Sequence, residues 1–112
     1  MINGAHTIIY SENAEDDREF FQNVLKCQHV DAGEGWLLFA LPPAELAVHP
    51  AETNGRQELY LMCEDVNAFA DEMKNNNIVC TEIADRGWGL VTQITLPGGG
   101  RLGVYQSRHA RP

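Results

Sequence analysis

Apolar and polar residues alternate with a period of two in several short stretches, and two other stretches repeat with a helical period. The alternating stretches predict strands over residues 4–11, 28–32, 36–41, 45–49, 58–63, 78–84, 88–96 and 101–106. Two helices are predicted after the N-capping residues Asn13 and Asp65, with apolar stripes at Phe20, Phe21, Val24 and Leu25 and at Val66, Phe69, Ala70 and Met73. Each half of the chain therefore predicts the order strand, helix, strand, strand, strand.

The two halves share short motifs at a nearly constant separation. Gly35-Trp36 recurs as Gly87-Trp88, and Leu46-Ala47-Val48-His49 recurs as Leu102-Gly103-Val104-Tyr105. The separation of the Gly-Trp pairs also relates His6 to Glu58. A repeat of about 50 residues indicates a duplicated structural unit.

Alternation along the predicted strands also indicates which side chains share a face. His6, Ile8 and Tyr10 point one way on the first strand, and Glu58, Tyr60 and Met62 do so on its counterpart in the second half. The opposite faces, which are expected to be buried against the helices, carry Leu59, Leu61, Cys63, Leu46, Val48, Leu102 and Val104. His6 and Glu58 are thus expected to converge on one cavity.

Length and charge limit the classes of function. A chain of 112 residues fits one domain, and a net charge of −8 argues against nucleic acid or an anionic membrane surface as a partner. The start carries no basic segment followed by an apolar run, so no signal peptide is expected. Three scattered cysteines without metal-type spacing indicate reduced thiols, and a cytoplasmic location is therefore expected.

Three segments carry a resemblance to a known family: Gly4-Ala5-His6-Thr7, the strand-to-helix junction at residues 64–69, and the closing segment at residues 96–105. Their order and spacing resemble the vicinal oxygen chelate superfamily, also called the glyoxalase, bleomycin-resistance and extradiol-dioxygenase superfamily. The resemblance implies an α+β fold over residues 1–112, in which two tandem βαβββ modules form an open, barrel-like curved sheet around a cavity. The modules would span about 3–50 and 57–108, joined by a linker at 51–56, and a homodimer is expected.

The same resemblance implies a candidate metal site. Metal-dependent relatives take one ligand from each of four strands, and His6 and Glu58 occupy the two opening-strand positions. Imidazole and carboxylate suit one divalent ion of zinc, iron, manganese or nickel. The closing-strand positions hold Ala47 and Gly103, which cannot bind a metal. Glu45 or His49, each two residues from Ala47 on the same face, is a candidate substitute, and His49 would complete a three-ligand site with His6 and Glu58. In the competing interpretation His6 is hydrogen-bonded to Glu58 and no ion is bound.

Three functions follow from these features. The first is a small-molecule binding protein whose cavity is lined by Tyr10, Trp36, Tyr60, Met62, Trp88 and Tyr105. The alternative is a metal-dependent lyase, isomerase or dioxygenase of glyoxalase type, in which Glu58 is the catalytic carboxylate that moves a proton. The third is a structural or regulatory dimer without a selected ligand. The missing closing-strand carboxylates and the acidic balance favour the binding protein.

Overall fold

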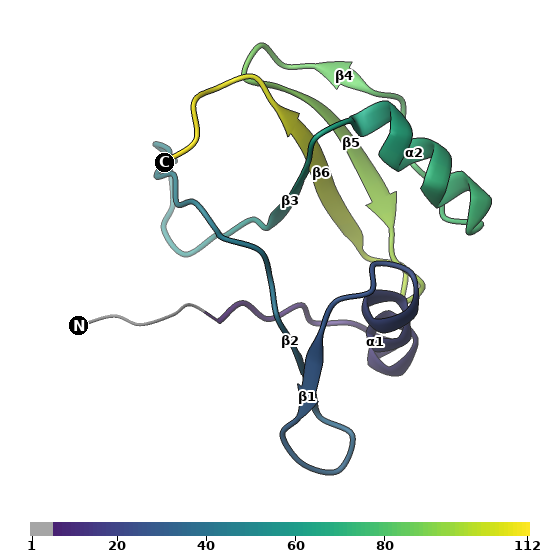
Figure 1. Ribbon diagram of the computed structural model, residues 1–112. Coiled ribbons are helices and arrows are strands. Elements are labelled where there is room, and N and C mark those ends of the chain that lie inside the picture. Colours follow the sequence, from purple (N-terminus) through teal and green to yellow (C-terminus); the bar gives the residue numbers. More distant parts are fainter. Residues whose placement is uncertain (1–5) are drawn as a thin grey trace.

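The structure of the protein is a computed structural model, which describes residues 6–112, and Figure 1 shows its α+β arrangement. Helix α1 spans Ala14–Asn23 and is followed by the short strands β1 (His29–Asp31) and β2 (Leu37–Phe39). The second half contains β3 (Tyr60–Cys63), α2 (Val66–Asn75), β4 (Ala84–Asp85), β5 (Gly89–Thr95) and β6 (Arg101–Ser107). The second half therefore has the predicted order of strand, helix and three strands.

The four strands of the second half form one sheet in the order β3-β6-β5-β4. Strand β3 runs parallel to β6, whereas β6, β5 and β4 are joined by antiparallel pairing. The turn between β5 and β6 is the predicted Pro-Gly-Gly-Gly turn, closed by a hydrogen bond of 2.8 Å from the Leu96 amide to the Gly100 carbonyl. This sheet is the framework on which the rest of the chain is arranged.

The core lies on the helix-facing side of this sheet. Leu102, Val104 and Ile94 are buried there and pack with Phe20, Phe21 and Met73 from the two helices. Leu59, Leu61 and Cys63 border the same core. The period-two prediction for β3 and β6 is thus confirmed, because every second side chain of these strands meets a helix.

Both predicted N-caps are confirmed. The Asn13 side chain accepts a hydrogen bond of 3.2 Å from the Asp16 amide, and Asp65 accepts bonds of 3.0 and 3.1 Å from the Asn67 and Ala68 amides. These bonds satisfy amide groups that have no partner inside the helix. Within residues 6–112, neither helix is long and apolar enough to cross a membrane.

Of the four strand predictions for the first half, those at 28–32 and 36–41 are confirmed by β1 and β2, and the other two are wrong over the described residues. Residues 6–11 and 45–49 form no strand, while Gly4 and Ala5 lie outside the described residues. Strands β1 and β2 form only an isolated hairpin, which projects away from the sheet in Figure 1. Leu46 and Val48, predicted to be buried, are 90% and 88% exposed. An apolar alternating stretch becomes a strand only where another strand accepts its backbone hydrogen bonds, and this chain offers these two stretches none.

The predicted strand at 78–84 is only partly formed. Its regular part is β4, preceded by a single bridge between Cys80 and Ile94. Side chains interrupt the ladder between them: the Thr92 hydroxyl donates to the Thr81 carbonyl at 2.7 Å, and the Gln93 amide donates to the Thr81 hydroxyl at 2.9 Å. The Thr81 amide still donates to the Gln93 carbonyl at 2.9 Å, so the hydroxyl group replaces only the return bond of this pair and the strand is irregular there.

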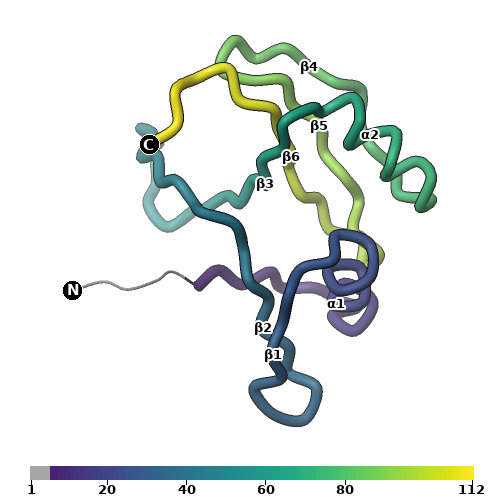
Figure 2. Tube along the Cα trace, viewed as in Figure 1, coloured from purple at the N-terminus to yellow at the C-terminus, as the bar shows by residue number. Residues whose placement is uncertain are grey.

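The chain is more open than its length requires. Its solvent-accessible surface is 9016 Å², whereas a compact chain of 12.5 kDa exposes about 6200 Å². The radius of gyration is 14.9 Å against about 13 Å for a compact domain of this length. Figure 2 shows that the trace through residues 6–12 and 40–58 runs apart from the four-stranded sheet over much of its length.

One buried carboxylate ties α1 to the sheet of the second half. Asp17 is 6% exposed, and its Oδ1 accepts a hydrogen bond of 2.7 Å from the Gly98 amide in the β5–β6 turn. A side chain at Gly98 would overlap the Ser11 hydroxyl and lie 3.0 Å from both Asp17 oxygens. Glycine at this position is therefore required for the close approach of the helix to the turn.

We expect Gly98→Ala to lower the free energy of unfolding by about 1–3 kcal/mol, because the added methyl group must displace Ser11 or Asp17. The matched control is Gly100→Ala in the same turn, where an added Cβ meets nothing within 4 Å, and a change below about 0.5 kcal/mol is expected. Urea unfolding followed by circular dichroism measures both. Equal losses in the two variants would contradict this account of the turn.

Candidate functional site

Three aromatic side chains meet on the sheet face opposite the helices. Tyr60 lies on β3, Trp88 directly precedes β5, and Tyr105 lies on β6. Their ring centroids are 6.1 Å apart for Tyr60 and Trp88, 5.7 Å for Tyr60 and Tyr105, and 5.0 Å for Trp88 and Tyr105. All three pairs are edge to face, which is a favourable geometry for aromatic rings. We call these three residues the aromatic cluster.

Two glycines allow the tyrosine rings to lie against the strands. Gly103 on β6 is paired in register with Tyr60, and a side chain there would overlap the Tyr60 ring. A Cβ at Gly89 on β5 would lie 2.8 Å from the Tyr105 ring and 2.9 Å from the Gln106 carbonyl oxygen. The rings thus occupy space that side chains would fill at other strand positions.

A hollow of about 260 Å³ adjoins the aromatic cluster at Tyr60. Its wall is formed by the extended chain near the start, by the segment leading into β3, and by β5 and β6, namely Ile8, Ile9, Gln57, Glu58, Leu59, Tyr60, Gln93, Arg101, Leu102 and Gly103. Glu58 and Tyr60 line it together with Leu59, which lies between them in the sequence. The first and second halves of the chain both contribute to this hollow.

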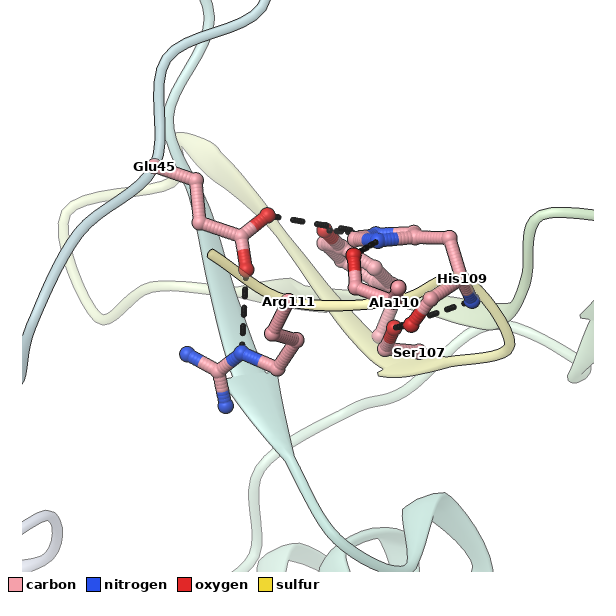
Figure 3. A network of polar contacts seen from close by, with 6 residues as sticks. Glu45, Ser107, His109, Ala110 and Arg111 are labelled. Carbon is pink, nitrogen blue, oxygen red and sulfur yellow. Dashed lines mark hydrogen bonds and ion pairs between the residues drawn. The ribbon is translucent and has the colours of Figure 1, made fainter.

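A polar group borders the aromatic cluster at Tyr105. The Tyr105 hydroxyl lies 3.1 Å from Nε2 of His109, which lies 3.9 Å from Oε2 of Glu45. Glu45 Oε1 accepts a hydrogen bond of 2.9 Å from Nε of Arg111, and Figure 3 shows Glu45 facing both residues. Burial raises the pKa of Tyr105, the charge of Glu45 raises it further, and Arg111 opposes this. Tyr105 is therefore a neutral hydrogen-bonding group at neutral pH.

The predicted metal ligands lie in different surroundings. His6 and His49 are exposed, and Glu58 forms an ion pair of 3.1 Å with Arg56. Within residues 6–112, no three His, Cys, Asp or Glu side chains are grouped to hold a metal ion. The Tyr60 ring also covers Gly103, one of the two closing-strand positions. Within the described part of the chain, His6, His49 and Glu58 are therefore not arranged as a metal centre.

The six predicted ligand-binding residues separate into two groups. Tyr60, Trp88 and Tyr105 come together, and Met62 is paired in register with Tyr105 on the same face of the sheet. Tyr10 is 90% exposed, and Trp36 is 65% exposed with the Arg18 guanidinium 5.3 Å from its ring centroid. Trp36 and Trp88 hold equivalent positions in the sequence repeat, but their surroundings differ. Trp36 follows the β1–β2 turn, outside the four-stranded sheet.

His109 and Arg111 were not among the predicted site residues, and Glu45 was considered only as a substitute metal ligand. Glu45 and Arg111 are 66 positions apart, and His109 lies beyond the last strand. No motif joins such distant residues, so only the path of the chain brings them together. The one sequence signal was that Arg108, His109 and Arg111 closely follow the strand that carries Tyr105.

The three cysteines are free and half-buried. Burial is the main cause that raises the pKa of each thiol, and at Cys63 the charge of Asp65 adds to it. A raised pKa keeps a thiol protonated and unreactive at neutral pH. The cysteines therefore belong to packing, as the helix-facing position of Cys63 predicted.

Comparison with known proteins places this geometry in a wider context. No family profile and no curated protein sequence matches the chain. Among solved structures, an antibiotic binding protein from Streptomyces sp. CB03234 matches with a TM-score of 0.67 at 18% identity, covering 96% of this chain and 99% of the other. Lactoylglutathione lyase from Agrobacterium tumefaciens matches with a TM-score of 0.62 at 15% identity, covering 92% of each chain.

A third match is a glyoxalase/bleomycin resistance protein from Streptomyces sp. CB03234, with a TM-score of 0.56 at 15% identity, covering 88% of this chain and 95% of that one. At these identities the matches establish the fold. They confirm the resemblance inferred from the sequence: this chain has the fold of the glyoxalase and bleomycin-resistance proteins of the vicinal oxygen chelate superfamily.

Proposed function

We propose that the protein binds a small aromatic molecule at the aromatic cluster and the adjoining hollow. The observation that carries this proposal is the meeting of three rings on a sheet face where Gly103 and Gly89 leave room for them. Trp88 is 44% exposed, so part of this aromatic surface is open to a ligand. Apolar and aromatic walls with a few polar groups are the usual composition of small-molecule sites.

The solved structures support a binding role of this kind. The antibiotic binding protein has the highest TM-score among those described above, and its match spans nearly the whole of both chains. The fold hosts several activities, so the argument for binding rests on the site. The site offers aromatic rings, a neutral Tyr105 hydroxyl and the carboxylates of Glu45 and Glu58.

The metal-dependent alternative receives less support from the residues of this chain. A Lewis-acid centre needs at least three converging donors, and His6, His49 and Glu58 are not grouped in this way. We therefore derive no catalytic step for Glu58. Its carboxylate instead contributes a negative charge to the wall of the hollow, next to Arg56.

Tyr60→Ala and Trp88→Ala are each expected to weaken binding of 2-naphthalenemethanol at least tenfold, which corresponds to about 1.4 kcal/mol, because each removes one face of the aromatic cluster. Isothermal titration calorimetry measures the affinity. Trp36→Ala is the matched control, since this exposed ring lies outside the cluster, and it should leave the affinity within about twofold. A loss as large in Trp36→Ala as in Trp88→Ala would contradict the location of the site.

We further propose that a second copy of the chain completes the barrel-like curved sheet. The chain exposes about 2800 Å² more surface than a compact chain of the same mass. Large permanent interfaces bury an area of this size. Much of the exposed apolar surface belongs to Ile8, Tyr10, Leu46 and Val48 in the two stretches that lack a strand partner. Pairing these stretches with another chain would satisfy their backbone groups and bury their side chains.

Light scattering after size exclusion should therefore give about twice the 12.5 kDa mass of one chain. Leu46→Glu combined with Val48→Glu should shift the protein to the monomer, because two charges cannot be buried in an apolar interface. Val79→Glu is the control. Val79 is also 69% exposed, but it lies next to Cys80, which pairs with Ile94 at the β4 edge of the four-stranded sheet. A wild-type monomer, or dissociation by Val79→Glu alone, would contradict this proposal.

A further inference from the structure

Glu45 differs from every other residue in its part of the chain. From Leu41 to Glu58 it is the one residue that is partly buried, and its side chain is 20% exposed. It is held in this position by contacts with His109 and Arg111 in the segment after β6, and Figure 3 shows its carboxylate facing both. A carboxylate that is partly removed from water needs a cationic partner.

His109 lies beside Glu45, but a neutral His109 imidazole does not supply the positive charge that Glu45 needs. His109 Nδ1 lies 2.8 Å from the Ala110 carbonyl oxygen, which can only accept, so Nδ1 carries the proton. In neutral His109, Nε2 is then the acceptor of the Tyr105 hydroxyl at 3.1 Å. These two hydrogen bonds determine the tautomer of neutral His109. Arg111 is then the formal cation paired with Glu45.

Arg111 holds Glu45 by a weak form of ion pair. Among the contacts within residues 6–112, only Nε of the guanidinium donates to Glu45, at 2.9 Å, and the paired two-nitrogen geometry of strong arginine–carboxylate contacts is not formed. The Arg111 side chain is 50% exposed and follows β6 in a stretch without helix or strand. Such a partner can be exchanged for another cation at little cost.

The carboxylate is also next to the aromatic cluster. His109 bridges the two, with its ring centroid 5.9 Å from that of Tyr105 and its Nε2 3.9 Å from Glu45. Tyr105 itself is buried, but Trp88, whose ring centroid is 5.0 Å from that of Tyr105, is 44% exposed. A ligand that places its rings against the exposed part of Trp88 would direct a substituent toward Glu45 along this side of the aromatic cluster. An ammonium or guanidinium group is the substituent that a carboxylate and nearby aromatic rings both attract.

We infer that Glu45 is the subsite for a cationic group of an aromatic ligand, and that Arg111 occupies this subsite as an internal substitute until the ligand displaces it. This inference rests on the proposed function and adds the ligand class: an aromatic amine or guanidine. The net charge of −8 favours approach of such a ligand but does not select a position for it. Selection comes from Glu45 and its exchangeable partner.

The test compares two probes of the same shape, 2-naphthylmethylamine and 2-naphthalenemethanol, by calorimetry at neutral pH. Arg111→Ala should strengthen binding of the amine by about two- to fivefold, the value of a partly exposed ion pair, and leave the alcohol unchanged. Glu45→Gln should remove the preference for the amine over the alcohol. The matched controls change the net charge equally at distant exposed sites, namely Lys74→Ala for Arg111 and Glu52→Gln for Glu45.

The outcomes separate this inference from the function on which it rests. If the alcohol binds but both probes respond equally to Arg111→Ala, or if Glu45→Gln acts no more strongly than Glu52→Gln, the cationic subsite is wrong and the aromatic site stands. If neither probe binds to any variant, both proposals are wrong. Tighter amine binding in Arg111→Ala but not in Lys74→Ala, together with lost preference in Glu45→Gln, supports the inference.

Discussion

The close contact of a tyrosine ring with a strand backbone is the constraint on which the site depends. Tyr60 can lie over β6 only because Gly103 has no side chain, and Tyr105 can lie over β5 only because of Gly89. Glycine weakens a strand interior by roughly 0.5–1 kcal/mol, so two of them on one sheet face carry a cost in stability. The aromatic contacts that they permit offset part of this cost, since edge-to-face pairs contribute about 0.5–1.5 kcal/mol each.

The same contact explains why the site departs from a metal centre. The Gly103 position, which the family resemblance equates with a ligand-bearing position, is covered by the Tyr60 ring in this chain. Restoring a carboxylate there would expel the ring and break up the aromatic cluster. The chemistry of metal ligation and the packing of Tyr60 exclude each other at this position.

Sequence patterns predicted the strands of the second half well, because the two faces of its sheet have different surroundings. Each strand residue there faces either a helix or the aromatic side, so alternation in β3 and β6 gave the correct faces for Leu61 and Val104. The same alternation predicted that Leu46 and Val48 are buried, but both are exposed. Alternation shows that a stretch is suited to a strand, and it does not show that a partner strand is present. The first strand prediction failed for the same reason over residues 6–11, the part of it that the structure describes. Capping residues were reliable because their hydrogen bonds are local.

The site was predictable only in its aromatic part. Tyr60, Trp88 and Tyr105 lie on or beside well-predicted strands, so their convergence follows from the sheet. Glu45 and Arg111 meet across 66 positions, through two segments without regular structure. Neither periodicity nor spacing encodes such a contact, which depends on the path of loops around the finished sheet.

The tie between Asp17 and the β5–β6 turn has a consequence for how this chain tolerates change. Surface turns between antiparallel strands usually accept insertions, because lengthening them costs little entropy and disturbs no neighbour. Here the turn presents the Gly98 amide to a helix from the other half of the molecule. An inserted peptide or affinity tag at this turn would break the hydrogen bond between α1 and the sheet. The exposed loop between β1 and β2, which projects away from the sheet in Figure 1, has no such contact to lose.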